Sequence, residues 1–201
     1  MSLVSVPYNV VLWGDSITQY GDLSKGWVNL LREAYSAQAM FTNQGISGLN
    51  SSQYLKFVQD PLFDQMMPKT CDKIIICLGA NDAGYQLESV ELHQGVPLST
   101  FVSNMSELFK LAQKYTSNVT IMLPPPLKQY IGRDPAQTEQ YSNAIKNLNL
   151  KTIDIRPKIT SVSDIHVDGI HMNENGNRVI FETVKEEIGT LKFWREHWKN
   201  W

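Results

Sequence analysis

The sequence predicts an α/β fold in which a five-stranded parallel sheet is covered by crossover helices on both faces. Two observations predict it. Short runs rich in valine, isoleucine and leucine recur along the chain, and longer segments with helical spacing of apolar residues lie between them. Strands that are buried on both faces form nearly continuous apolar runs, and parallel neighbours need a long connection between them.

Five apolar runs are the predicted strands. They occupy residues 9–14 (NVVLWG), 40–45, 73–79 (KIIICLG), 118–123 (NVTIML) and 152–155. Each is short and is followed by a turn-forming or helical segment, as expected of a sheet whose strands alternate with helices.

Helices are predicted between these strands and after the last one. The expected ranges are 27–37, 51–67, 98–115, 135–148 and 175–194. Pro61 should kink or split the second range, because proline cannot continue a helix interior. The range 98–115 has the clearest period, since its apolar residues repeat at three- and four-residue steps and would form one buried stripe: Phe101, Met105, Leu108, Leu111 and Ala112.

Length and composition indicate a single domain over residues 1–201. With 201 residues, 42% of them hydrophobic, the chain can bury one sizeable core, and no repeat or linker-like stretch divides it. The 18 Lys and Arg residues nearly balance the 20 Asp and Glu residues, so no nucleic-acid partner is expected. The sequence leaves a homo-oligomer open.

The location expected from the sequence is the cytoplasm. The first residues lack the basic region of a secretory signal, and no apolar stretch is long enough to span a membrane. Cys71 and Cys77 lie around one predicted strand, where Cys77 is inside the apolar run. It is therefore predicted to be a buried thiol and not half of a disulfide.

Candidate functional residues occur in the loops where ligands bind in open parallel sheets, at the carboxyl ends of strands. Gly14-Asp15-Ser16 follows the first predicted strand, and the segment 43–48, with Gly45 and Gly48, follows the second. Gly79-Ala80-Asn81-Asp82 follows the third strand, and Asp168-Gly169-Ile170-His171 precedes the last helix.

These residue types fit nucleophilic catalysis by serine. The Ser16 hydroxyl is a poor nucleophile at neutral pH unless a base removes its proton. The His171 imidazole could accept that proton and return it to the leaving alcohol. Asp168, three residues upstream, could accept a hydrogen bond from Nδ1 of His171 and leave Nε2 facing Ser16.

Together, the four motifs resemble the SGNH hydrolases, which are also called the GDSL family. The order GDS, loop glycine, GxND and DxxH agrees with that family, and LGANDA at 78–83, VPL at 96–98 and DGIH at 168–171 are similar to its isoamyl-acetate-hydrolysing esterases. The resemblance implies a flavodoxin-like three-layer α/β/α sandwich and ester hydrolysis with neither a metal nor an organic cofactor. It also implies an oxyanion hole formed by the backbone N–H groups of Ser16 and Gly48 and the Asn81 side chain.

Structural roles are the alternatives for several of these residues. Ser16 could cap the following helix, although Asp15 is the better cap and is expected to support the loop. Asn81 could form a turn, as Asp82 is expected to do. Among the other histidines, His166 is the main competitor for the role of base, because it lies two residues from Asp168.

Substrate and role also have alternatives. A small-molecule ester is the expected substrate, and an acyl thioester, a lysophospholipid or an acetylated sugar would suit the same machinery. A catalytically inactive ligand-binding module is the non-enzymatic alternative, although neither GxGxxG nor a P-loop is present. The loops 84–95 and 124–133 could shape the pocket, and the tryptophan-rich segment 193–201 could pack on the domain or bind a partner.

Overall fold

The computed structural model describes residues 7–36, 38–84, 95–128 and 133–191. They contain one five-stranded sheet with the order β2-β1-β3-β4-β5, in which every neighbouring pair is parallel. The strands are β1 (Tyr8–Gly14), β2 (Ala39–Gly45), β3 (Lys73–Cys77), β4 (Val119–Met122) and β5 (Thr152–Ile153). The predicted parallel α/β sheet is confirmed, and its strand order is that of flavodoxin-like folds.

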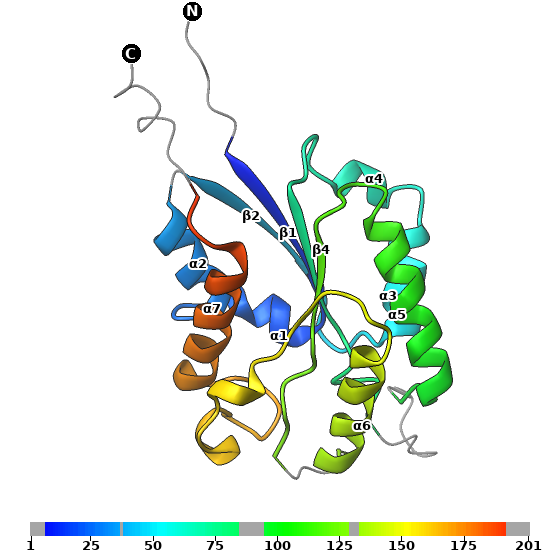
Figure 1. Cartoon of the computed structure of the whole chain (residues 1–201), viewed down its shortest axis with the longest axis vertical. Coiled ribbons are helices and arrows are strands. Elements are labelled where there is room, and N and C mark those ends of the chain that lie inside the picture. Colours follow the sequence, from blue (N-terminus) through cyan, green and yellow to red (C-terminus); the bar gives the residue numbers. More distant parts are fainter. Residues whose placement is uncertain (1–6, 37, 85–94, 129–132, 192–201) are drawn as a thin grey trace, which may run out of the picture.

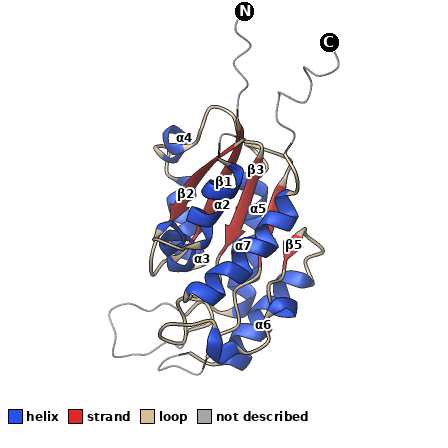
Figure 2. Cartoon of the chain, turned by 90° about the vertical axis from the view of Figure 1, so that its left-hand side faces the viewer, coloured by secondary structure: helices blue, strands red, loops and turns tan. Residues whose placement is uncertain are grey.

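Helices cover both faces of the sheet (Figure 1). On one face lie α1 (Ser16–Gln19), α2 (Trp27–Tyr35) and α7 (Glu174–Ile188). On the other lie α3 (Ser51–Gln59), α4 (Phe63–Met66), α5 (Leu98–Ala112) and α6 (Pro135–Lys146). Figure 1 shows the three layers side by side, and in Figure 2 α2 and α7 lie in front of the strands.

Short 3-10 turns complete the fold, at Tyr20–Asp22, Arg156–Lys158 and Val162–Asp164. Within the segments that the structure describes, no helix is both long enough and apolar enough to cross a membrane. Cys71 and Cys77 are both free, and Cys77 is buried, as predicted.

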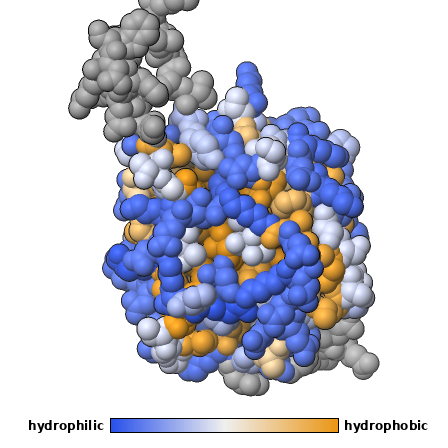
Figure 3. Space-filling view, in the orientation of Figure 1, coloured by the Kyte–Doolittle hydropathy of each residue, from blue (hydrophilic) through white to orange (hydrophobic). Residues whose placement is uncertain are grey.

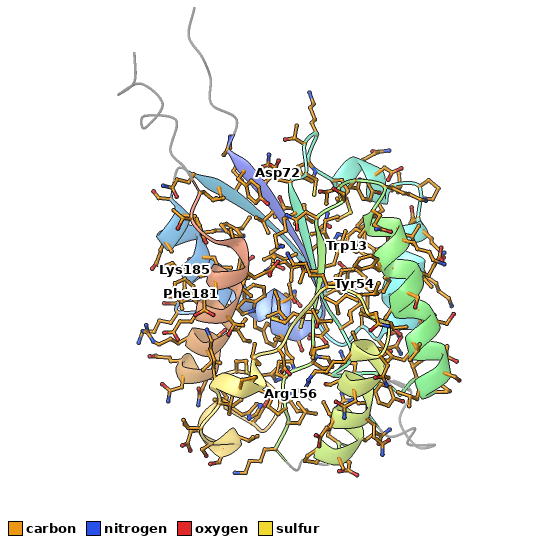
Figure 4. All side chains as sticks on the ribbon, viewed as in Figure 1. Trp13, Tyr54, Asp72, Arg156, Phe181 and Lys185 are labelled. Atoms are coloured by element: carbon orange, nitrogen blue, oxygen red, sulfur yellow. The ribbon has the colours of Figure 1, made fainter. Side chains whose placement is uncertain are left out.

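Alternate side chains of the strands fill two separate cores. In β1, Val11 and Trp13 belong to the core under α3–α6, whereas Val10 and Leu12 belong to the core under α2 and α7. The Trp13 ring lies 5.4 Å from that of Phe63 and 6.3 Å from that of Tyr54, between the sheet and the helices (Figure 4). The face of the molecule shown in Figure 3 is largely hydrophilic, with smaller patches of hydrophobic residues, some of them near its centre.

Several helices end earlier than predicted: the helices predicted over 98–115 and 135–148 end at Ala112 and Lys146. The predicted helix 51–67 is split at Pro61 into α3 and α4, as expected. The predicted helix 175–194 is wrong at residues 189–191, because Gly189 adopts φ 74° and ψ −165°, a conformation that ends the helix; its residues 192–194 lie outside the described residues. Three other predicted features lie wholly or partly outside the described residues: the tryptophan-rich segment 193–201, residues 85–94 of the loop 84–95 and residues 129–132 of the loop 124–133.

Candidate active site

Three strands end at the same level and bring their following loops together. Gly14, the last residue of β1, pairs with Gly45 on one side and with Cys77 on the other. The Asp15 N–H donates to the Cys77 carbonyl at 3.3 Å, and the Ile46 N–H donates to the Gly14 carbonyl at 2.9 Å. The sheet therefore places Ser16, Gly48 and Asn81 in neighbouring loops at its carboxyl edge.

Glycine is required at the turn between β1 and α1. A Cβ atom on Gly14 would lie 2.1 Å from Oγ1 of Thr18 and 2.7 Å from the carbonyl oxygen of Cys77. The following Asp15 is the N-cap of α1, where its Oδ1 accepts from the Ile17 N–H at 2.9 Å. Since Asp15 provides the cap, the hydroxyl of Ser16 is not used for capping.

The Ser16 hydroxyl faces the imidazole of His171. Its Oγ lies 3.0 Å from Nε2 of His171, although the two residues are 155 positions apart. On the other side of the ring, Nδ1 of His171 lies 2.6 Å from Oδ2 of Asp168. A hydrogen bond from Nδ1–H to the carboxylate leaves Nε2 as the acceptor for the serine proton.

Asp168 is held in its ionised form by hydrogen bonds. Burial acts to raise the pKa of this carboxyl, but donation from the His171 imidazole and from the backbone N–H groups of His171 and Ile170 lowers it to about 2. These backbone groups donate to Oδ1 at 2.8 and 2.9 Å, so the DxxH spacing folds the segment back on its own carboxylate. An ionised Asp168 can accept from Nδ1–H across the neutral pH range.

Of the other histidines, the structure describes His166, and this residue is not in the arrangement of Ser16, His171 and Asp168. Nδ1 of His166 lies 2.9 Å from the carbonyl oxygen of Val162, and burial lowers the pKa of this imidazole. The structure therefore brings His171 to Ser16 and engages His166 elsewhere. His93 and His197 lie outside the part of the chain that the structure describes.

A cavity of about 400 Å³ opens beside Ser16 and His171. Its apolar lining includes Tyr20, Leu23 and Val167. Its polar lining includes Lys25 and Glu174, whose side chains form an ion pair at 2.6 Å. The Tyr20 ring packs on the His171 imidazole with centroids 5.1 Å apart. The sequence did not single out Tyr20, although its position four residues after Ser16 places it on the same side of the turn.

Asn81 lies beside the loop that carries Gly48. Its Nδ2 donates to the carbonyl oxygen of Leu49 at 2.9 Å, and only 6% of Asn81 is exposed. Gly48 has φ 81°, in the left-handed region that favours glycine. An amide Nδ2 carries two hydrogens, so the bond to Leu49 leaves one for another acceptor.

Asp82 does more than form a turn, which is all that was predicted for it. Its fully buried carboxylate accepts from the Ser51 N–H at 3.0 Å and from the Ser51 hydroxyl. Burial raises the pKa of Asp82 to about 6, against the lowering effect of these bonds. Asp82 therefore fixes the first turn of α3 to the loop after β3.

Arg133 is a second site residue that sequence reasoning missed. Its guanidinium is buried and donates from Nη1 to the Asn81 carbonyl at 3.0 Å and from Nη2 to Oδ1 of Asn81 at 2.9 Å. The signal for it was indirect: Asp15 and Asp82 follow apolar strands, and two buried carboxylates call for a cation near them. The sequence does not say which cation.

An arrangement of serine, histidine and aspartate side chains at the carboxyl edge of a parallel sheet is typical of one class of protein, the α/β serine hydrolases. The chain belongs, within that class, to the GDSL-like lipase/acylhydrolase family, whose model matches residues 12–179. It is thus a carboxylic ester hydrolase of the SGNH type.

Curated relatives agree with this family. GDSL esterase/lipase At2g38180 of Arabidopsis thaliana is 29% identical over 91% of this chain, which spans 64% of that relative's length. The isoamyl acetate-hydrolyzing esterase 1 homolog of Mus musculus is 24% identical over 95% of this chain and 87% of the relative.

Solved structures share the fold. The acetyl xylan esterase AlAXEase has a TM-score of 0.73 at 21% identity, over 90% of this chain and 100% of its own. A lipase/acylhydrolase from Enterococcus faecalis has a TM-score of 0.71 at 22% identity, over 90% of this chain and 95% of its own.

Proposed function

We propose that this enzyme hydrolyses small to medium carboxylic esters through an acyl-Ser16 intermediate, with His171 as the base and Asp168 as its orienting group. One observation carries the proposal. Hydrogen bonds connect the three side chains in a row: Oγ of Ser16 lies 3.0 Å from Nε2 of His171, and Nδ1 of His171 lies 2.6 Å from Oδ2 of Asp168. This is the geometry in which a serine proton can be removed during attack.

In the first half of the reaction, Oγ of Ser16 attacks the ester carbonyl carbon while its proton passes to Nε2 of His171. The carbonyl π-electrons move to the oxygen and form a tetrahedral intermediate. Asp168, ionised because its pKa is about 2, stabilises the imidazolium. The intermediate collapses, the C–O bond to the alcohol breaks, and Nε2 returns the proton to the leaving oxygen.

The second half repeats these steps with water. His171 removes a proton from a water molecule, which attacks the acyl carbon of the acyl-enzyme. Collapse of this second intermediate releases the carboxylic acid, and Oγ of Ser16 regains its proton from Nε2. The protein's own groups complete the cycle.

The negative oxygen of each intermediate needs donors that are in place beforehand. The proposed donors are the N–H groups of Ser16 and Gly48 and the remaining N–H of the Asn81 amide. The loops that carry them meet at the ends of β1, β2 and β3, which supports this assignment. Such preorganised donors stabilise the transition state because they need no reorientation when the charge appears.

The size and lining of the cavity favour a substrate whose group beside His171 is small and mainly apolar. Its volume of about 400 Å³ lies on the His171 side of Ser16, where the leaving alcohol receives its proton, and Leu23 and Val167 are among its lining residues. Esters of acetate occur in the names of relatives and of solved structures with this fold. A short acyl group with an apolar alcohol is therefore the first substrate to test, before thioesters, lysophospholipids and acetylated sugars.

A labelling experiment tests the nucleophile. A fluorophosphonate probe should modify the wild type at Ser16 and leave Ser16→Ala unlabelled, and turnover of p-nitrophenyl butyrate by Ser16→Ala should fall by about a thousand-fold or more. Ser163→Ala, which removes an exposed serine hydroxyl that does not line the cavity, is the matched control and should label and turn over as the wild type does. Ester turnover close to that of the wild type in Ser16→Ala would disprove the mechanism.

A substrate series tests the size range. Turnover of p-nitrophenyl acetate, butyrate, octanoate and palmitate should be greatest among the short and medium esters, because the hollow beside Ser16 is small. A clear preference for palmitate would contradict the proposed range. The predicted cytoplasmic location is a separate matter and stays a prediction.

A further inference from the structure

We infer that Arg133 is a positioning residue for the oxyanion hole, which holds the Asn81 amide with its NH2 group toward the reacting carbonyl oxygen. The inference rests on the proposed function, because it takes Asn81 to be an oxyanion donor. The inference adds a second residue, Arg133, which acts on the reaction through Asn81 and carries a positive charge.

The Arg133 guanidinium forms two hydrogen bonds with Asn81. Nη1 donates to the backbone carbonyl of Asn81 at 3.0 Å, and Nη2 donates to its side-chain Oδ1 at 2.9 Å. The two terminal nitrogens therefore fix the backbone and the side chain of one residue relative to each other. A planar guanidinium suits this fork, which an ammonium group cannot reproduce.

This contact determines which way the amide points. A guanidinium only donates hydrogen bonds, so the group of Asn81 that faces Arg133 must be the carbonyl oxygen. The Nδ2 atom then faces the opposite side, where one of its hydrogens goes to the Leu49 carbonyl at 2.9 Å. A flipped amide would lose both contacts and would set NH2 against donors, so the remaining N–H keeps its direction.

The surroundings of Arg133 keep the charge close to the amide. Only 8% of Arg133 is exposed, and the buried carboxylates of Asp15 and Asp82 interact favourably with its guanidinium. A cation at Oδ1 polarises the amide and makes Nδ2–H a stronger donor.

Gly84 provides the space for the guanidinium. The backbones of Gly84 and Arg133 form an isolated antiparallel bridge, and a Cβ atom on Gly84 would lie 2.0 Å from Nη1 of Arg133. The atom that meets this Cβ is the end of a flexible side chain. Gly84→Ala should therefore push the guanidinium away from Asn81 without removing its charge from the protein.

A double-mutant cycle on kcat and KM tests the inference. With p-nitrophenyl butyrate, Arg133→Met should lower kcat by about ten- to a hundred-fold and change KM by less than about twofold, because the lost interaction is made in the transition state. In an Asn81→Ala background, the same substitution should cost less than about threefold, because its target is gone. Arg156→Met, which breaks a contact with Asp154 away from Ser16, is the matched control and should keep the wild-type kcat.

Two further variants keep the test decisive if Arg133→Met folds poorly. Gly84→Ala should lower kcat in the same sense as Arg133→Met and should also lose its effect in the Asn81→Ala background. Arg133→Lys should stay below the wild-type kcat, because an ammonium cannot hold both oxygens. Thermal unfolding midpoints of all variants confirm that the assays compare folded proteins.

The outcomes separate this inference from the proposed function. Equal losses in the wild-type and Asn81→Ala backgrounds, or wild-type kcat in Gly84→Ala or Arg133→Lys, would overturn the role of Arg133 while Ser16 still labels. Loss of the Ser16 requirement itself would instead overturn the proposed function.

Discussion

At the scale of the residue, two carboxyl groups near Ser16 have opposite environments. Asp168 is ionised because the His171 imidazole and two backbone N–H groups donate to it, which outweighs burial and lowers its pKa to about 2. Asp15 is only 1% exposed, and burial raises its pKa to about 7 despite the hydrogen bond from Ile17. Asp15 therefore gains a proton near neutral pH, while Asp168 does not.

The raised pKa of Asp15 predicts a pH-dependent stability that Asp15→Asn should lack. A carboxyl with a pKa of about 7 in the folded state and 3.8 in the unfolded state binds more protons when folded, so its contribution to stability increases as the pH falls from about 7 toward about 4. Relative to Asp15→Asn, the wild type should gain up to about 4 kcal/mol over this window. Urea unfolding at several pH values measures the difference, and parallel curves for the two proteins would contradict it.

At the scale of the element, α7 holds the segment that carries His171. Asn173 caps the helix by accepting from the Gly176 N–H at 3.0 Å, two residues after His171. Asn177 accepts from the Trp27 N–H at 3.1 Å and donates to the Met172 carbonyl at 3.1 Å, so it ties this helix to α2 and to the residue after His171. The N-terminal end of α7 therefore positions His171, whereas its C-terminal end lies away from His171 and is expected to affect stability but not catalysis.

Gly189→Ala tests the end of α7. Gly189 has φ 74° and ψ −165°, a region that is essentially reserved for glycine, and nothing lies within 4 Å of a Cβ placed there. Backbone strain without a clash should lower the free energy of unfolding by about 1–2 kcal/mol. Chemical denaturation measures it, with the exposed neighbour Thr190→Ala as control. The kcat should not change, because His171 lies at the other end of the helix; unchanged stability would argue against the strain.

At the scale of the whole molecule, a buried ion pair joins the sheet to α7 at the edge opposite the site. Lys73 begins β3 and its side chain is 1% exposed. Its Nζ lies 2.6 Å from Oε1 of Glu187 in α7 and 3.0 Å from Oγ1 of Thr120 in β4. Glu187 also pairs with the half-exposed Lys151 at 2.6 Å. Glu187 would therefore keep a cationic partner if Lys73 were replaced, whereas Lys73 would lose its carboxylate if Glu187 were replaced.

Because only Glu187 has a second partner, substituting Glu187 should lower the free energy of unfolding more than substituting Lys73. Glu187→Ala leaves the buried Lys73 cation without an anion and should lower the free energy of unfolding by about 2–4 kcal/mol. Lys73→Met leaves Glu187 paired with Lys151 and keeps an apolar stem of similar length, so it should cost less than about 2 kcal/mol. Thermal and urea unfolding compare them, and a larger cost for Lys73→Met would refute the explanation. Both variants should keep the wild-type kcat.

The sequence by itself determined the elements of this protein and the residues that its chemistry can use. The apolar runs marked β1 and β3 because both faces of each strand are buried, and Pro61 marked the break between α3 and α4. The motifs around Ser16, Asn81 and His171 stood at strand ends or before a helix, where side chains of this kind meet ligands. These are local signals, which periodicity and turn chemistry express within a few residues.

Only the tertiary structure decided which of these residues meet. The contact between Ser16 and His171 joins positions 155 apart, and the contact between Arg133 and Asn81 joins positions 52 apart. Such contacts depend on the strand order and on the register that levels Gly14, Gly45 and Cys77, and no local pattern encodes them. For the same reason Arg133 could not be identified from the sequence: a lone arginine beside a helix start acquires its role only when the fold buries it against Asn81.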